Sequence, residues 1–349
     1  MRSEGSLHIC VTRRQQEQFL AQELALRLPG LKCNELAPQV IALGDISLED
    51  LVRFPLFFSS QLLPNAVPIE AQSISAWTNA ILSHLREQFG EASSPWSLHI
   101  FEPLTAETGE SYARAELIKQ ELRLLLKQKR RSLARALHEV CSADCTLVQV
   151  LLTSKTTGFI SVASPSQRAL CRAALSPYEA GVCAIADDKN PPSRAFKKLR
   201  EAIAVFGLSI RADSRAVDLG ASPGGWTHVL VEHGATVTAV DRSPLEGAIA
   251  RSSRVTFTQG NAFSWTPPQG VDWLVCDVIT TPDRTLEILR TWIGEKVCRN
   301  FCVTIKFKGD PDFQTLHLIQ HFLASHTAWW DGRQLTHNKN EVTVVGRAY

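Results

Sequence analysis

Apolar and polar residues follow two different patterns along the 349-residue chain, and the pattern changes near residue 176. After that point, short apolar runs alternate with segments of helical periodicity, which is typical of a mostly parallel sheet covered by helices. The runs predict strands at 215–220, 235–240, 255–259, 272–277 and 301–306. The segments 327–334 and 341–346 are expected to form an antiparallel hairpin. We therefore predict an α/β fold whose last strand is antiparallel.

The first 175 residues mix helical and strand periodicity without this regular alternation. Strands are expected at 7–12, 39–43 and 54–58, with a helix over 14–28, and these elements make a small α+β module. Further along we expect helices over 70–88 and 111–141 and strands over 98–101, 147–152 and 159–162. The predicted domains are 1–65, 66–175 and 176–349.

A polar, loop-like segment over 176–192 opens the C-terminal part. Ser193 is a suitable N-cap for a helix that runs to about Phe206, and Gly207 is expected to end it.

Composition indicates a globular protein, with 44% hydrophobic and 21% charged residues. No apolar run is long enough to span a membrane, and the N-terminus does not resemble a signal peptide. The nine cysteines include no C-x-x-C pair, so we expect reduced thiols, no metal site and a cytoplasmic location.

The formal net charge is only +2, so any surface that binds nucleic acid must be local. The densest basic run lies in the predicted helix over 111–141. By itself such a run is the solvated face of a helix. The run contains Lys127, Lys129, Arg130 and Arg131.

The C-terminal part contains a glycine-rich turn between an apolar strand and a helix, at 216–227. This layout is typical of a nucleotide-type cofactor site. Glycines there can adopt positive φ angles and let a ligand approach the backbone. A second strand ends at Asp241, whose carboxylate can accept hydrogen bonds from both hydroxyls of a ribose. The candidate cofactor-binding residues are Asp218, Gly220, Ser222, Gly224, Gly225, Trp226, Asp241, Asn261 and Asp277.

The glycine-rich turn lacks the patterns of two common kinds of nucleotide site, the dinucleotide site and the phosphate-binding loop. The dinucleotide pattern G-x-G-x-x-G is absent, and Trp226 stands where a phosphate-binding loop needs lysine. No cluster of Lys or Arg lies near this turn to hold a pyrophosphate. A ligand with ribose and adenine but no phosphate fits better, so we expect S-adenosylmethionine.

These segments resemble the motifs of the FtsJ-like RNA 2′-O-methyltransferases. Residues 218–226 resemble the cofactor motif of that family, and 192–199 resemble its Ser-Arg-x3-Lys-Leu entry motif. The segments 274–277, 304–306 and 340–344 fall where the family places the rest of a Lys-Asp-Lys-Glu tetrad. The resemblance covers roughly residues 176–349 and implies a Rossmann-like methyltransferase sheet. The long N-terminal part is similar to that of members acting on large-subunit ribosomal RNA, which implies a cytidine 2′-oxygen of 23S rRNA as the target.

Within the N-terminal part, the order helix, strand, helix, strand, strand over 66–175 resembles a THUMP domain, an RNA-binding module. In that context the basic run becomes a candidate for phosphate contact. Arg194 is expected to touch phosphate or to anchor its loop.

The resemblance implies a catalytic tetrad of Lys198, Asp277, Lys306 and Glu341. Methylation of a ribose hydroxyl requires a base, and a lysine can serve if burial or a neighbouring lysine lowers its pKa. We expect Lys306 to be that base. Lys197 is an alternative to Lys198 as the first lysine of the tetrad. Lys308, a surface lysine, is the alternative to Lys306.

Two alternatives to this enzyme remain open at this point. The first is an idle RNA-binding protein that retains the methyltransferase fold. The second is a base methyltransferase, although an N-x-x-Tyr-type motif is absent after the fourth strand. The family often has an acidic residue on the adenine side where this chain has Asn261. We expect a monomer with large-subunit ribosomal RNA as its partner and no membrane partner.

Overall fold

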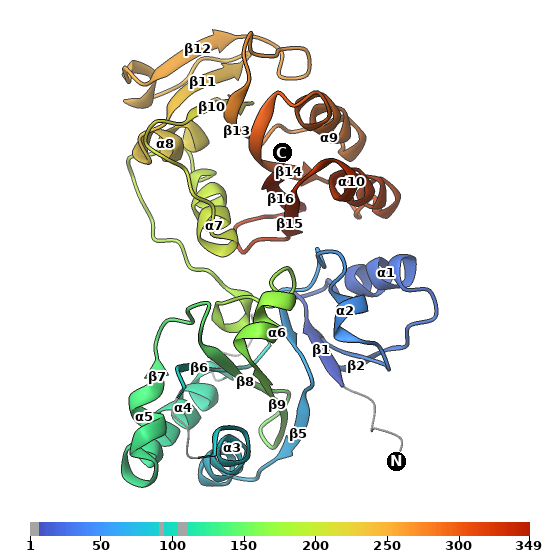
Figure 1. The fold of residues 1–349 in the computed structure, drawn as a ribbon, viewed down its shortest axis with the longest axis vertical. Helices are drawn as coiled ribbons and strands as arrows, with labels where there is room; N and C mark the ends of the chain where they lie inside the picture. Colours follow the sequence, from blue (N-terminus) through green and yellow to red (C-terminus); the bar gives the residue numbers. More distant parts are fainter. Residues whose placement is uncertain (1–6, 91–93, 104–110) are drawn as a thin grey trace. The chain divides into compact units, whose positions relative to one another are not determined.

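The computed structural model describes residues 7–90, 94–103 and 111–349 (Figure 1). Contacts between Cα atoms divide the chain into two compact units, Met1–Val182 and Cys183–Tyr349. No helix in the described residues is long and apolar enough to cross a membrane. None of the nine cysteines, all of which lie in the described part, forms a disulfide.

The first unit begins with a four-stranded sheet in the order β2-β3-β1-β4. Its elements are β1 (His8–Val11), α1 (Glu17–Arg27), β2 (Cys33–Ala37), β3 (Val40–Leu43), α2 (Leu48–Leu51) and β4 (Gln61–Leu63). The strand predicted at 54–58 is wrong. The backbone N–H groups of Phe57 and Phe58 donate to the buried carboxylate of Glu23 at 2.9 and 3.1 Å, so they are not available to a sheet.

A five-stranded sheet follows in the same unit, in the order β5-β9-β8-β6-β7. Its elements are β5 (Val67–Glu70), α3 (Ile74–Phe89), β6 (Trp96–Phe101), α4 (Ser111–Lys129), α5 (Arg131–Ala136), β7 (Leu137–His138), β8 (Thr146–Leu152), β9 (Thr157–Ala163), α6 (Pro165–Leu170) and η1 (Glu179–Gly181). The division of the first 175 residues into two domains, and the THUMP assignment, stay predictions.

The single helix predicted over 111–141 is wrong beyond Lys129. The backbone leaves helical geometry at Arg130, with φ −145° and ψ 65°, and α5 then begins. The indole N–H of Trp96 donates to the carbonyl of Leu133 at 3.0 Å, and Leu137 pairs with Trp96 in the sheet. These contacts turn the chain back toward β6.

The second unit is one seven-stranded sheet in the order β12-β11-β10-β13-β14-β16-β15. Its elements are α7 (Phe196–Phe206), β10 (Arg215–Leu219), α8 (Gly225–Glu232), β11 (Thr236–Asp241), η2 (Ile249–Arg251), β12 (Val255–Gln259), β13 (Val271–Cys276), α9 (Pro282–Leu289), η3 (Arg290–Gly294), β14 (Cys298–Lys306), α10 (Phe313–His326), β15 (Trp329–Arg333) and β16 (Glu341–Arg347). Figure 1 shows α7 and α8 on one face of the sheet and α9 and α10 on the other. The predicted α/β class, with a Rossmann-like and mostly parallel sheet, is confirmed.

The final strand enters the sheet between β14 and β15 and runs antiparallel to both. The predicted hairpin is therefore present, and its second strand lies inside the sheet. Because β16 is reversed, its first residue, Glu341, lies opposite the last residue of β14, Lys306. A polar residue at the start of β16 thus reaches the edge where the parallel strands end.

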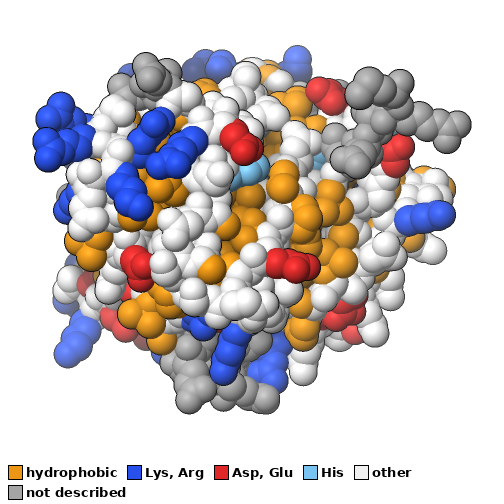
Figure 2. All heavy atoms as spheres, turned by 90° about the horizontal axis from the view of Figure 1, so that it is seen from below, with side chains coloured by type: hydrophobic (Ala, Val, Ile, Leu, Met, Phe, Trp, Pro, Cys, Tyr) orange, Lys and Arg blue, Asp and Glu red, His pale blue; other side chains and the backbone are white. Residues whose placement is uncertain are grey.

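The helix before this sheet begins later than predicted. Ser193 is not its N-cap, because α7 starts at Phe196 and Ala195 occupies the capping position. The predicted end is confirmed, since Gly207 has a left-handed conformation with φ 64°. On the face of the molecule in Figure 2, Lys and Arg side chains form several separate groups, in keeping with the small net charge.

Candidate active site

Two lysines and two carboxylates meet at the carboxyl edge of the sheet. The Nζ atom of Lys198 lies 3.1 Å from an oxygen of Asp277 and 2.6 Å from one of Glu341. The Nζ atom of Lys306 lies 2.8 Å from Asp277 and 3.5 Å from Glu341. Each ammonium group thus contacts both carboxylates, and the four side chains are only 6–16% exposed. The structure therefore brings the four predicted tetrad residues into one cluster.

The topology explains why residues so distant in sequence converge. Asp277 directly follows β13 and Lys306 ends β14, and these strands are parallel neighbours. Glu341 opens β16, and Lys198 projects from α7. Asp277 is further oriented by the hydroxyl of Thr304, which donates to it at 2.7 Å.

The charge state of Lys198 follows from its surroundings. Burial alone lowers the pKa of Lys198, but the carboxylates of Asp277 and Glu341 outweigh burial and raise its pKa above the ordinary value. The two carboxylates therefore favour the protonated form of Lys198.

The two competing lysines lie outside the cluster. The Nζ atom of Lys197 contacts Asp187 at 2.6 Å, so its side chain is directed elsewhere. Lys308 is exposed and, among the described residues, forms no ion pair. The geometry thus favours Lys198 and Lys306 over both competitors.

A cavity of about 340 Å³ lies beside this cluster, above the glycine-rich turn. Its volume falls within the range of small-molecule sites, about 300–1,000 Å³. Asp277 and Lys306 belong to the wall, so the cavity reaches the cluster directly. The predicted residues that line the cavity are Asp218, Gly220, Ser222, Gly225, Trp226, Asp241 and Asp277.

The glycines of the turn are required by the protein's own packing. A Cβ atom on Gly220, whose φ is +76°, would lie 2.5 Å from a methyl group of Val278. A Cβ atom on Gly225 would lie 2.4 Å from the hydroxyl oxygen of Ser193. The missing side chains therefore leave room for neighbouring segments of the chain, and the approach of a ligand to this turn stays a prediction.

Two carboxylates, those of Asp218 and Asp241, line the cavity. Asp218 is buried and accepts the hydroxyl of Thr227 at 2.6 Å. Burial raises the pKa of Asp218 to about 7. Asp241 accepts the backbone N–H of Ser222 at 3.0 Å and that of Ser243 at 3.0 Å. Asp241 therefore holds the turn in place while it lines the cavity.

The cavity also contains an unsatisfied polar group. Ser193 lines the cavity, and its buried hydroxyl has no hydrogen-bond partner among the described residues. A buried polar atom without a partner is costly. Trp226 lines the same cavity, and its indole N–H donates to the carbonyl of Ala195 at 2.9 Å.

Two predicted cofactor residues do not line this cavity. Asn261 is exposed, and its side chain accepts the backbone N–H of Phe263 at 3.2 Å. Gly224 has φ +118°, and a Cβ atom there would lie 2.7 Å from Ile249. A direct role of either residue in ligand binding stays a prediction.

A second cavity, of about 710 Å³, adjoins the first. Ala195, Ile279 and Lys306 belong to the walls of both. Lys198 and Glu341 line only the second cavity. A group bound in one cavity can therefore approach a group bound in the other beside Lys306.

A further buried residue, Glu201, was not predicted from the sequence. Its carboxylate accepts the backbone N–H groups of Thr336 and His337 at 2.6 and 2.8 Å. Glu201 lies one turn after Lys198 on α7, and His337 lines the second cavity. The only signal in the sequence is an acid three residues after the tetrad lysine, on the same side of a helix.

The residues predicted to bind RNA differ in their exposure and in their partners. Arg194 is 88% exposed at the second cavity, and its guanidinium lies 3.9 Å from Asp187. Lys127, Lys129 and Arg131 are exposed in the first unit. Arg130 is partly buried, and its guanidinium donates to the carbonyl of Gly90, which ends α3.

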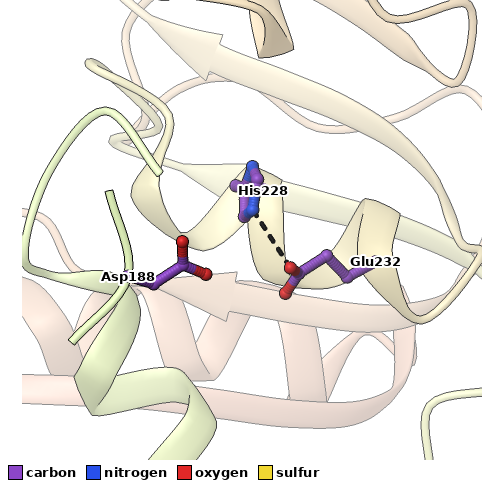
Figure 3. A group of neighbouring side chains, drawn as sticks. All are labelled: Asp188, His228 and Glu232. Atoms are coloured by element: carbon purple, nitrogen blue, oxygen red, sulfur yellow. Dashed lines mark hydrogen bonds and ion pairs between the residues drawn. The ribbon is translucent and has the colours of Figure 1, made fainter. Parts of the chain in front are cut away.

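Another group of side chains could be mistaken for a metal site. Asp188, His228 and Glu232 lie together, with His228 3.2 Å from Glu232 (Figure 3). The guanidinium of Arg200 contacts both carboxylates, at 2.8 Å from Asp188 and 2.7 Å from Glu232. Both acids are thus already paired with one arginine, and we assign no metal to this group.

The chain resembles known methyltransferases. Residues 191–321 match the family model for FtsJ-like methyltransferases. A ribosomal RNA large subunit methyltransferase M from Thauera aminoaromatica is 34% identical over 214 residues, covering 58% of this chain and 57% of that protein. The protein of the same name from Azoarcus sp. strain BH72 is 37% identical over 182 residues, covering 48% and 50%. The chain thus spans about half the length of the curated relatives it matches.

Among solved structures, TrmN from Thermus thermophilus is similar over 98% of this chain and 99% of its own. The identity is 14% and the TM-score 0.32. The family match covers α7, the glycine-rich turn and strands β10 to β14, which carry three of the four clustered side chains. This chain therefore contains an FtsJ-like methyltransferase domain.

Proposed function

We propose that this protein is an S-adenosylmethionine-dependent RNA methyltransferase that modifies a ribose 2′-oxygen, with large-subunit ribosomal RNA as its substrate. The observation that carries the proposal is the position of Lys306, in the wall of both cavities and in contact with both carboxylates. One cavity suits a nucleoside cofactor, and the other is open to a larger substrate.

The first cavity fits the proposed cofactor. Asp241 offers a carboxylate to the hydroxyls of a ribose. The unpartnered hydroxyl of Ser193 offers a hydrogen bond to the amino-acid part of the ligand. When bound, S-adenosylmethionine supplies an electrophilic methyl group.

The four clustered side chains would then prepare the substrate oxygen. Lys306 accepts the proton of the 2′-hydroxyl, because it alone of the two lysines reaches both cavities. Lys198 stays protonated and supports the developing negative charge on the oxygen. Asp277 and Glu341 hold both lysines in position. Positioning of this kind removes much of the entropic barrier to the reaction.

The first unit would contribute RNA affinity. We propose that Lys127, Lys129 and Arg131 contact phosphates, whereas Arg130 supports the end of α3. Arg194 would contact the RNA at the second cavity. Ribosomal RNA as substrate places the reaction in the cytoplasm, where we propose that the protein acts as a monomer without a metal ion.

The test is methyl transfer to unmodified large-subunit ribosomal RNA made by transcription. The RNA is incubated with the protein and labelled S-adenosylmethionine, digested to nucleosides and analysed by mass spectrometry. The proposal predicts a 2′-O-methylnucleoside at one site, and the same site should lack the modification in cells without this protein. Methylation of a base would contradict the ribose assignment. Binding of RNA and cofactor without transfer would identify an idle RNA-binding protein.

A further inference from the structure

Two lysines lie just beyond the paired ends of β14 and β16 and line the same cavity. The ladder pairs Lys306 with Glu341. It continues by one step, since the backbone N–H of Phe307 donates to the carbonyl of Asn340 at 3.0 Å. The next residues along the two segments are Lys308 and Lys339, which lie in bends outside the strands.

The backbone around both lysines is held firmly. The side-chain amide of Asn340 donates to the carbonyls of Phe307 and Gly309, at 3.2 and 2.6 Å. The side chain of Gln334 donates to the carbonyl of Lys339 at 2.8 Å. The two lysines are therefore presented from an ordered platform, which reduces the entropy lost on binding a ligand.

Like charges that line the same cavity repel each other. Both side chains are exposed, both line the second cavity, and neither forms an ion pair with a described residue. The cavity's inner lysines differ in this respect, because Lys197, Lys198 and Lys306 each contact a carboxylate. Among the lysines of the cavity, Lys308 and Lys339 are thus the two that have no acidic partner in the described residues.

We propose that Lys308 and Lys339 together bind one backbone phosphate of the substrate RNA, next to the nucleotide that is methylated. This site rests on the proposed function and specifies how its substrate is held. Lys308 lies two residues beyond Lys306, which is at most about 7 Å along the chain. At about 3.4 Å per stacked nucleotide, the phosphate lies within two nucleotides of the target. A phosphate between the two ammonium groups removes their repulsion.

The test measures binding of a fluorescein-labelled mixed-sequence RNA of about 30 nucleotides to the full chain with S-adenosylhomocysteine, over a range of KCl concentrations. The variants are Lys308→Ala/Lys339→Ala and Lys308→Arg/Lys339→Arg. Arg299→Ala is the matched control, because Arg299 is an exposed cation near the opposite end of β14. Affinity for S-adenosylhomocysteine, measured in parallel, shows that each variant is folded.

The double alanine variant should bind RNA about tenfold or more weakly. Its slope of log affinity against log salt should fall by about 0.7, the value for one phosphate on a single strand. The double arginine variant and Arg299→Ala should bind within about twofold of the wild type. Equal affinities and slopes for the double alanine variant and Arg299→Ala would overturn the proposal. Tighter lysine-dependent binding of polyglutamate than of RNA would also overturn it, in favour of an acidic protein partner.

Failure of the proposed function gives a different result. A wild-type protein that binds RNA through both lysines but transfers no methyl group refutes the enzyme and leaves the phosphate site supported. A wild-type protein that does not bind RNA refutes both.

Discussion

The carboxylate of Glu201 accepts the backbone N–H of Thr336 at 2.6 Å, across 135 residues of chain. A second hydrogen bond, from the backbone N–H of His337 at 2.8 Å, makes the contact bidentate. Glu201 follows Lys198 on α7, and Thr336 precedes Glu341 in the segment that leads into β16. The contact therefore couples α7, which carries Lys198, to the segment that leads to Glu341 at the start of β16.

Glu201→Gln should weaken this coupling, because an amide can present only one acceptor to two donors. We expect the free energy of unfolding to fall by about 1–3 kcal/mol and methyl transfer to slow, with unchanged affinity for S-adenosylhomocysteine. Glu295→Gln changes an exposed acid of the same domain and serves as the control. Denaturant unfolding and single-turnover kinetics measure the two effects. Wild-type turnover in the destabilised variant would show that Glu201 supports the fold without positioning the site.

Glu201 also illustrates what sequence alone could predict. The site positions of Asp277 and Lys306 could be predicted from the sequence, because each ends an apolar run and parallel strands end at the same edge of a sheet. The choice of Lys198 over Lys197 depended on the resemblance to a family. The role of Glu201 could not be predicted, because its partners are backbone groups about 135 residues away that carry no signal in the sequence.

The errors have similar physical causes. The helix expected over 111–141 contains no Gly or Pro after Lys129, so local propensity continues through the break at Arg130. After the break, Leu133 and Leu137 contact Trp96, so tertiary contacts override the local helix propensity. The fold class was predictable because it depends on a repeated pattern of strands, and such patterns are insensitive to single contacts.

Asp218 should make stability depend on pH. Its folded-state pKa is raised to about 7 by burial, against an ordinary value of 3.8. Between these values the folded protein retains a proton that the unfolded chain has lost, so stability falls as pH rises toward 7. Asp218→Asn should abolish this contribution while keeping an acceptor for Thr227.

Unfolding free energies of the wild type and Asp218→Asn between pH 5 and 8 measure this effect. The wild type should lose about 1 kcal/mol per pH unit relative to the variant below pH 7, with little further change above it. A constant difference between the two proteins across this range would rule out a proton on Asp218 in the folded state.

Asp241→Ala should weaken cofactor binding by about 1–3 kcal/mol, because the carboxylate lines the first cavity and can accept ribose hydroxyls. The carboxylate also holds the N–H of Ser222, so the alanine variant combines two effects. Asp241→Asn retains one acceptor for the turn and should lose less affinity. Calorimetry with S-adenosylhomocysteine compares the variants, and equal affinity in all three proteins would remove Asp241 from the site.

The central claim is that Lys306 accepts the proton of the substrate hydroxyl. Single-turnover methyl transfer from S-adenosylmethionine to unmodified large-subunit ribosomal RNA, compared for the wild type, Lys306→Ala and Lys306→Arg, tests it most directly. Both variants should bind S-adenosylhomocysteine, because the glycine-rich turn and Asp241 are unchanged. Both should lose a factor of about 10²–10⁴ in rate, since alanine has no base and arginine stays protonated. Wild-type rates in Lys306→Arg would contradict the claim and show that Lys306 acts only as a fixed positive charge.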